Sequence, residues 1–240
     1  MRTKLARGCR LIAALAAALV TAAGAARAGC VWSDLVTQES RVAAVRNGAP
    51  QTYFVQDDVL ARGCPNEGAA CRSRAYLTPG DVVLTGKAQG AYTCAGFVGA
   101  RGAVTIDWLP TASLVPLPEA EQVPTDWVGR WSAPEQDIAI TPGRGGALAV
   151  KGNATWGMGD PERRRRGGVH IGELEGEARP SKGVLAFAMG EDGRTLPHDG
   201  GDEFTCRVRM WRRGPYLLTQ DNNGCGGANV SFSGFYRRKG

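Results

Sequence analysis

Six cysteines carry the clearest chemistry beyond residue 28: Cys30, Cys64, Cys71, Cys94, Cys206 and Cys225. An even set in an exported chain indicates disulfides. Cys64 and Cys71 enclose a turn-rich stretch that a local bridge would pin, which leaves Cys30 for Cys94, although three pairings of these four are possible. The last two cysteines would tie two late strands together. We expect three bridges and no free thiol.

The sequence offers few residues that could carry out acid-base catalysis or bind a metal. Residues 29–240 contain two histidines, His170 and His198, and no nucleophile elbow or zinc-binding helix motif. Glu173 follows His170 by three positions, which on a strand points the two side chains to opposite faces. The acidic stretch 191–203 offers oxygen ligands for a hard cation but lacks the spacing of a calcium loop. The sequence therefore predicts no catalytic residue, no metal site and no cofactor.

Arg163, Arg164, Arg165 and Arg166 form the one local run of charge, directly after Asp160-Pro161-Glu162. Adjacent arginines repel one another, so the run is typical of a solvated loop. Its functional interpretation is an electropositive contact for an anionic surface such as wall polymer, lipopolysaccharide or an acidic partner. These four residues are the candidates for partner binding.

The first 28 residues have the pattern of a secretory signal peptide. A basic segment precedes the apolar core 11–20, and Ala26-Arg27-Ala28 fits the cleavage pattern, so the mature chain should begin at Gly29 in the periplasm or outside the cell. Gly29-Cys30 also resembles the end of a lipobox, although Arg27 stands where a branched apolar residue is expected. No second long apolar run follows, so we expect no transmembrane segment.

Cleavage of a signal peptide would lower the net charge, which is +6 for the whole chain. Five of the 29 basic residues and none of the 23 acidic residues lie in residues 1–28, which leaves +1 for residues 29–240. Nucleic-acid binding needs a sustained cationic face, so we expect no nucleic-acid partner. The oligomeric state is left open.

A proline-rich stretch divides the chain. Residues 116–126 hold three prolines and two glutamates, which suits an extended linker. We expect a small β domain over residues 29–115 and an antiparallel β-barrel over 127–240. Because four of the six cysteines precede the linker and two follow it, each domain can close its own bridges.

Short β-prone runs fill the first domain. Residues 81–85, 91–98 and 104–108 are expected strands between turns. Residues 33–45 could instead be helical, with Ser33 as the N-cap and Leu35 on the apolar face.

In the second domain, apolar and polar residues alternate as they do in β-strands. Residues 136–141 and 147–152 flank a glycine-rich turn and predict a hairpin, and 184–189, 204–211 and 229–237 are further strands. In 204–211, Phe204 and three alternate residues should face the core. Strands with one buried face and one solvent-exposed face recur along this domain, and this pattern favours an up-and-down barrel. Four tryptophans are expected in the core rather than on a sugar-binding platform: Trp127, Trp131, Trp156 and Trp211.

Three segments of the first domain resemble the bacterial Src-homology-3-like family. They are Leu77-Thr-Pro-Gly-Asp81, Gly90-Ala-Tyr-Thr-Cys94, and Trp108-Leu-Pro with Leu114, and the resemblance spans about forty residues. Asp107 stands where that family usually has glycine. The resemblance implies a small barrel that binds wall peptides or proteins.

The second domain resembles the calycin plan, in which a Gly-x-Trp on the first strand packs under a basic residue from the last. Gly129-Arg130-Trp131 and Arg237-Arg238 carry this resemblance. The segment 221–236 is similar to the end of uncharacterised exported proteobacterial proteins, and loosely to periplasmic lysozyme inhibitors, although Ser233-Gly-Phe-Tyr236 is one residue short of their loop.

Binding is therefore the expected function: an exported protein that recognises cell-wall material or a protein partner, in one version by inhibiting a wall-degrading hydrolase. The alternatives are a cell-wall hydrolase that uses His170, Glu173 or the acidic stretch, and a lipocalin-like carrier, which would need an apolar cavity.

Overall fold

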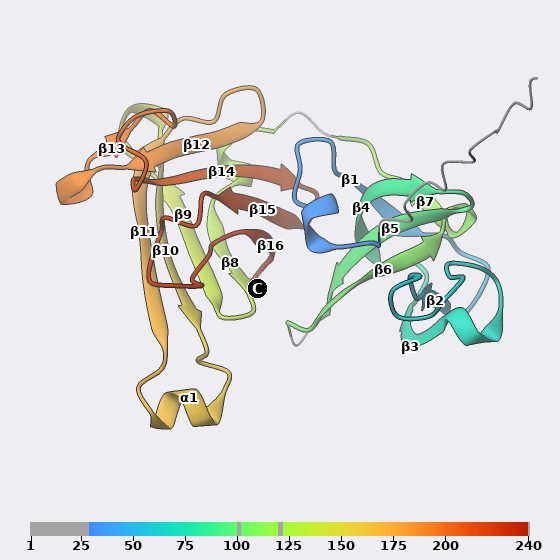
Figure 1. Cartoon of the computed structure of the whole chain (residues 1–240). Helices are drawn as coiled ribbons and strands as arrows, with labels where there is room; N and C mark the ends of the chain where they lie inside the picture. The colour runs from blue at the N-terminus through green and yellow to red at the C-terminus, as the bar shows by residue number, and fades with distance from the viewer. Residues whose placement is uncertain (1–28, 100–101, 120–121, 240) are drawn as a thin grey trace, which may run out of the picture.

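The computed structural model describes residues 29–99, 102–119 and 122–239 (Figure 1). The predicted fold class is confirmed, because the described chain is nearly all β, with two antiparallel sheets, one of them an almost closed barrel, and three disulfides. The predicted signal peptide lies outside the described residues.

The first sheet has seven strands: β1 (Arg41–Val45), β2 (Thr52–Val55), β3 (Arg72–Leu77), β4 (Val82–Gln89), β5 (Tyr92–Val98), β6 (Val104–Pro110) and β7 (Leu114–Pro116). Their order across the sheet is β3-β2-β6-β5-β4-β1-β7. Four short 3-10 turns accompany them or follow in the linker: η1 (Trp32–Asp34), η2 (Ala69–Cys71), η3 (Thr111–Ser113) and η4 (Pro124–Asp126).

The second sheet has nine strands: β8 (Gly129–Ala133), β9 (Gln136–Pro142), β10 (Leu148–Trp156), β11 (His170–Ala178), β12 (Val184–Met189), β13 (Thr195–Leu196), β14 (Cys206–Arg213), β15 (Tyr216–Asp221) and β16 (Gly234–Arg238). Their order is β11-β10-β9-β8-β16-β15-β14-β12-β13. Its helical elements are α1 (Pro161–Arg165), η5 (Arg144–Gly146) and η6 (Glu191–Gly193).

Two local expectations from the sequence were wrong. Residues 33–45 are not a helix, because Val42 and its neighbours form β1, which pairs with β4 on one side and β7 on the other. The β-branched valines of β1 favour a strand once two partner strands are present. Phe204 is 78% exposed and lies before β14. Asp202 holds its segment in a turn, accepting from Thr205 Oγ1 at 2.8 Å and from the Phe204 amide at 3.1 Å.

Barrel closure depends on glycine at positions where β11 meets its neighbours. A Cβ on Gly176 would lie 2.3 Å from the Phe187 ring of β12, and one on Gly172 would lie 2.4 Å from the Cys225 carbonyl oxygen. The gap between β11 and β13 is bridged through a side chain, since the backbone amide of Glu177 donates to Thr195 Oγ1 at 2.7 Å. The inward-facing positions hold large side chains, with Trp131, Phe187, Phe232 and Tyr236 all nearly inaccessible to solvent.

One end of the barrel is closed around Trp131. The Arg238 guanidinium of β16 lies 4.8 Å from the centroid of the Trp131 ring, and the Trp131 indole N–H donates to the Trp127 carbonyl at 2.9 Å. Arg238 also donates to the Asp126 carbonyl. Gly129 has a φ of 150°, and a Cβ there would come within 3.3 Å of the Arg238 side chain.

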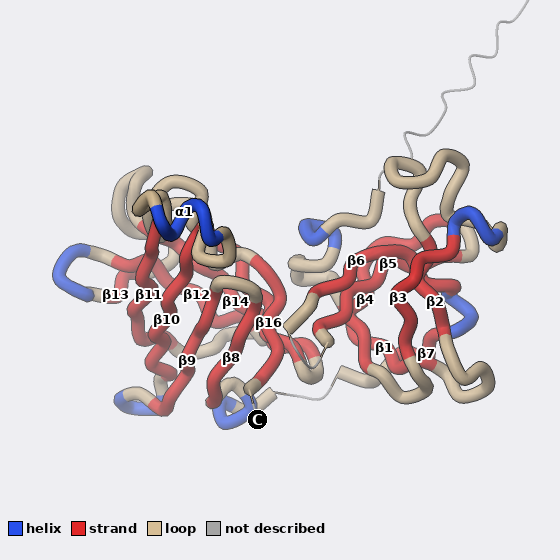
Figure 2. The backbone as a smooth tube through the Cα atoms, turned by 90° about the horizontal axis from the view of Figure 1, so that it is seen from below, coloured by secondary structure: helices blue, strands red, loops and turns tan. Residues whose placement is uncertain are grey.

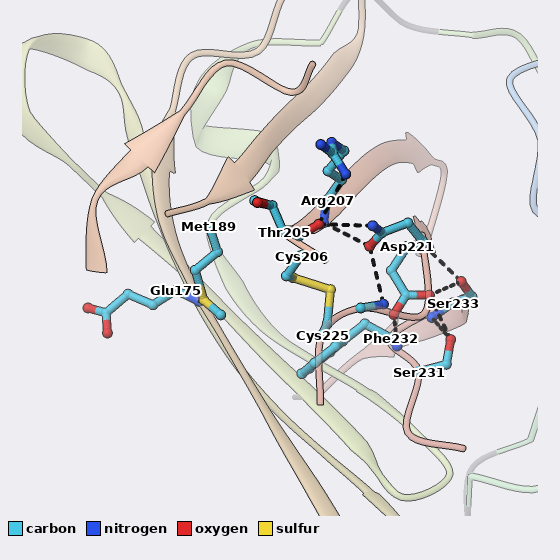
Figure 3. The surroundings of a disulfide bond; sticks show 12 residues. Glu175, Met189, Thr205, Cys206, Arg207, Asp221, Cys225, Ser231, Phe232 and Ser233 are labelled. Carbon is cyan, nitrogen blue, oxygen red and sulfur yellow. Dashed lines mark hydrogen bonds between the residues drawn. A yellow bond between two sulfur atoms is a disulfide. The ribbon is translucent and has the colours of Figure 1, made fainter. Parts of the chain in front are cut away.

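The three disulfides pair Cys30 with Cys94, Cys64 with Cys71, and Cys206 with Cys225, which is the pairing that the sequence favours. Figure 3 shows the third bridge beside a hydrogen-bonded cluster at the end of β15. Asp221 accepts there from the Ser231 hydroxyl at 2.7 Å, the Ser233 hydroxyl at 2.6 Å and the Phe232 amide at 2.9 Å. The bridge and this carboxylate together fix the long segment between β15 and β16.

Candidate functional site

The four arginines lie at the end of the β10–β11 hairpin, which extends beyond the rest of the barrel (Figure 1). We call residues 157–168 the arginine tip. The four arginines are solvent-exposed, as the sequence predicts, but part of their segment is helical rather than a loop: Pro161–Arg165 is one helical turn, α1. Asp160 is its N-cap and accepts from the Glu162 amide at 2.8 Å, and Pro161 takes the first helical position. An aspartate directly before a proline is a helix-start signal, so this short helix was predictable from Asp160-Pro161.

Side chains outside α1 hold the arginine tip in place. Glu135, in the β8–β9 turn, accepts from the Gly157 amide at 3.0 Å and from the Gly159 amide. The Arg163 guanidinium lies 3.9 Å from the centroid of the Trp156 ring. His170, which pairs with Trp156 across the two strands, has its ring centroid 5.2 Å from that of the same indole. These contacts give the tip a defined conformation.

The four arginines do not have equal roles. Arg163 packs on Trp156 and lies 3.5 Å from Asp160, so it is part of the framework. Arg165 and Arg166 share Glu162, and their side chains are 70% and 76% exposed. Arg164 is exposed, and its side chain has no hydrogen bond or ion pair in the described structure. Arg164, Arg165 and Arg166 are therefore the residues that remain available to a partner.

The groups considered for catalysis do not converge. His170 Nδ1 is hydrogen-bonded to the Ala228 carbonyl, and Glu173 points outward on the same strand, where it is exposed. His198 lies 3.5 Å from the Arg209 guanidinium, and burial followed by the positive charges of Arg209 and Arg207 lowers its pKa. Among the described residues, no three His, Cys, Asp or Glu side chains gather in a metal-binding group.

The barrel and the first sheet lie side by side (Figure 2). Polar side chains of the barrel form hydrogen bonds to backbone carbonyls of the first domain. Arg213 donates to the Gln38 carbonyl at 2.7 Å and to the Ser40 carbonyl at 2.8 Å. The Tyr216 hydroxyl donates to the Val82 carbonyl at 2.5 Å, and Arg237 donates to the Val98 carbonyl at 2.7 Å. Burial raises the pKa of Tyr216 to about 12.

Apolar residues complete this interface. Trp211, Leu218 and Phe235, on the outer face of β14, β15 and β16, are buried in one cluster with Leu35 and Leu84 of the first half. The alternating pattern of the strands predicts a solvated outer face here, and this prediction is wrong. Apolar residues on both faces of a strand, such as Leu217 and Leu218 in β15, indicate that both faces are covered.

No described helix is long and apolar enough to cross a membrane. Three disulfides are typical of a protein that folds in an oxidising compartment outside the cytoplasm. Comparisons of this chain with protein-family models, curated proteins and solved structures found no match.

Proposed function

We propose that this chain is an exported, periplasmic binding protein and that the arginine tip makes its main contact with an anionic partner. The barrel and the first sheet form the framework from which the hairpin projects. The partner is cell-wall polymer or an acidic protein surface, and inhibition of a wall-degrading hydrolase is one form that such binding would take.

The observation that carries this proposal is the fixed, exposed presentation of Arg164, Arg165 and Arg166. Ordering a flexible loop on binding costs conformational entropy, which a loop already held in place avoids. Glu135, Asp160 and the packing of Arg163 on Trp156 hold this tip before any partner arrives. Arginine also suits carboxylate and phosphate groups, since its planar fork of donors matches their oxygens.

Further support comes from the composition of the tip and from the first sheet. Residues 157–168 hold four arginines and two acids, Asp160 and Glu162, so the tip is net positive although residues 29–240 carry only +1. The resemblance of the first domain to the Src-homology-3-like family would add a second surface for wall peptides or proteins. An enzyme is the weaker alternative, because the ring of His170 is engaged by Ala228 and Trp156.

The test is binding to purified wall sacculi, and capture from periplasmic extract, by three forms of the chain spanning residues 29–240. The first form is unchanged, and the second carries Arg164→Ser, Arg165→Ser and Arg166→Ser. The third is a charge-matched control with serine at three exposed arginines that have no side-chain partner in the described structure: Arg62, Arg74 and Arg194.

We expect the unchanged and control forms to retain the same partner and the tip variant to lose it. Equal retention by all three forms would contradict the role of the tip. Hydrolysis of the sacculi that is abolished by His170→Ala would replace the binding function with the enzymatic alternative.

A further inference from the structure

The segment before β1 lies against a carboxylate of the first domain. Gly29 is half-buried, and the next residue holds it in place, because Cys30 is buried and bonded to Cys94. A Cβ on Gly29 would lie 2.5 Å from Asp57 Oδ2. The backbone nitrogen of Gly29 is two covalent bonds from that Cβ position, so it lies within about 5 Å of the same oxygen. Gly29 is therefore held beside this carboxylate.

The two oxygens of the Asp57 carboxylate differ in their contacts. Oδ1 accepts from the amides of Val59 and Leu60, each at 3.0 Å, which fixes the orientation of the group. Oδ2, on the side of Gly29, has no hydrogen bond or ion pair within the part of the chain that the structure describes. A cation that paired with Oδ2 would leave the Oδ1 contacts as they are.

A second carboxyl group adds negative charge at this place. Asp107 is 8% exposed, and burial first, and then the charge of Asp57, raise its pKa to about 6, so it is ionised at pH 7.5. No Lys or Arg of the described residues forms an ion pair with Asp57 or Asp107. Asp58 is also acidic and accepts from the Gly63 amide. A positive charge beside Asp57 would reduce this repulsion.

The disulfide of Cys30 bears on where such a charge would arise. A lipid-modified Cys30 would need a free thiol and would itself be the first residue of the exported chain. Its sulfur is instead bonded to Cys94, and the residue is 6% exposed. Cleavage before Gly29 is therefore the version of the predicted signal that fits the structure.

We propose that the α-ammonium group freed at Gly29 forms an ion pair with Asp57, so that removal of the export signal also stabilises the folded first domain. Hydrolysis of the Ala28–Gly29 peptide bond by a signal-cleaving endopeptidase adds one water: Ala28 keeps the new carboxylate, and the Gly29 nitrogen becomes an ammonium. A peptide N–H donates in one fixed direction, whereas an ammonium has three donors that can turn toward Oδ2. The proposal rests on cleavage at this bond and is independent of the arginine tip.

The pKa of the Gly29 α-amino group tests the ion pair directly. In the chain spanning residues 29–240, NMR titration should find this pKa about 0.5 or more above the ordinary value of about 7.7–8.0, because an adjacent carboxylate favours the charged form. Asp57→Asn keeps an oxygen for the Val59 and Leu60 amides and should return the pKa to the ordinary range. Asp199→Asn is the matched control, since Asp199 is an exposed carboxylate of the barrel, and it should leave the pKa unchanged.

Acetylation of the Gly29 amine removes the charge and keeps the sequence. At pH 7 it should lower the melting temperature by about 1–3 °C, the size expected for one partly exposed ion pair, and Asp57→Asn should abolish that difference. The pKa is raised in the folded chain, so the stabilisation is fully present below the ordinary pKa. It should be lost as the pH rises through the folded pKa, where the ammonium gives up its proton.

N-terminal sequencing of the exported chain tests the cleavage separately and should begin at Gly29. The ion pair is overturned if the α-amino pKa has its ordinary value, if Asp57→Asn leaves that pKa raised, or if acetylation lowers the melting temperature equally with and without Asp57→Asn. An exported chain that begins at another residue overturns the link to export. None of these results changes the binding expected of the arginine tip, so the two proposals fail independently.

Discussion

The guanidinium of Arg213 donates to the carbonyl oxygen of Gln38 across 175 positions of sequence, at 2.7 Å. The same side chain reaches the Ser40 carbonyl, and its burial lowers the pKa of the guanidinium. This residue on β14 therefore ties the barrel to the segment that leads into β1.

Replacing Arg213 should destabilise the whole chain, because the carbonyls of Gln38 and Ser40 would lose their donor. We expect Arg213→Met to lower the free energy of unfolding by about 1–3 kcal/mol, the usual cost of leaving buried polar groups unpaired. Chemical denaturation measures this. Arg209→Met is the control, since Arg209 lies on the same face of β14 but is exposed. Equal stability of the two variants would contradict the role of the interface.

Adding a methyl group at Gly176 should strain the barrel where β11 meets β12. The new Cβ would lie 2.3 Å from the Phe187 ring, so Gly176→Ala should cost about 1–3 kcal/mol, as overpacking usually does. Phe187→Leu in the same chain should recover part of the loss. Gly99→Ala is the control, because its Cβ would meet only an ordinary contact at 3.6 Å. Thermal unfolding in which Gly176→Ala matched the control would argue against this closure.

The contribution of each disulfide to the free energy of unfolding should increase with the length of chain that it closes. Their sequence separations are 64 for Cys30–Cys94, 19 for Cys206–Cys225 and 7 for Cys64–Cys71. The chain-entropy relation gives about 4, 3 and 2.5 kcal/mol for their removal in that order. Denaturation of the three double Cys→Ala variants tests the ranking, and thiol titration of the unchanged, denatured chain should find no free thiol. A free thiol would contradict the set of three bridges.

Asp107 should make stability depend on pH. Burial first, and then the negative charge of Asp57, raise the pKa of Asp107 from 3.8 to about 6. The folded chain thus holds this proton more tightly than the unfolded chain, so stability falls as pH rises from about 4 to about 6 and then stays level.

Asp107→Asn should therefore stabilise the chain at pH 7.5, by about 1–2 kcal/mol after allowance for solvent screening, and should flatten the profile between pH 4 and 6. Melting temperatures of both forms across this range provide the measurement. A parallel shift at every pH would show that the carboxyl does not titrate as described.

Strand positions were predictable from the sequence where alternation and turns agreed. The hairpin of β9 and β10 and the strand Val184–Met189 follow directly from such patterns. The error at residues 33–45 arose because strand pairing with β4 and β7 is non-local and outweighs the weak helical pattern.

The candidate sites were only partly predictable. The sequence shows that four arginines are adjacent, but the separation of Arg163 from the other three depends on its contact with Trp156. The interface between the barrel and the first sheet was not predicted, because residues far apart in the sequence, such as Arg213 and Gln38, come together only when the barrel docks on the first sheet.

The most direct test of the proposed function is the salt dependence of binding to an anionic wall polymer by the unchanged chain and by the Arg164, Arg165 and Arg166 serine variant. Removing three charges should weaken binding at least tenfold at low salt and should flatten the dependence on salt, since fewer ionic contacts remain to be screened. The melting temperature should be nearly unchanged, because Arg163 and its contact with Trp156 are retained. Equal affinity and an equal salt slope for the two forms would contradict the proposal.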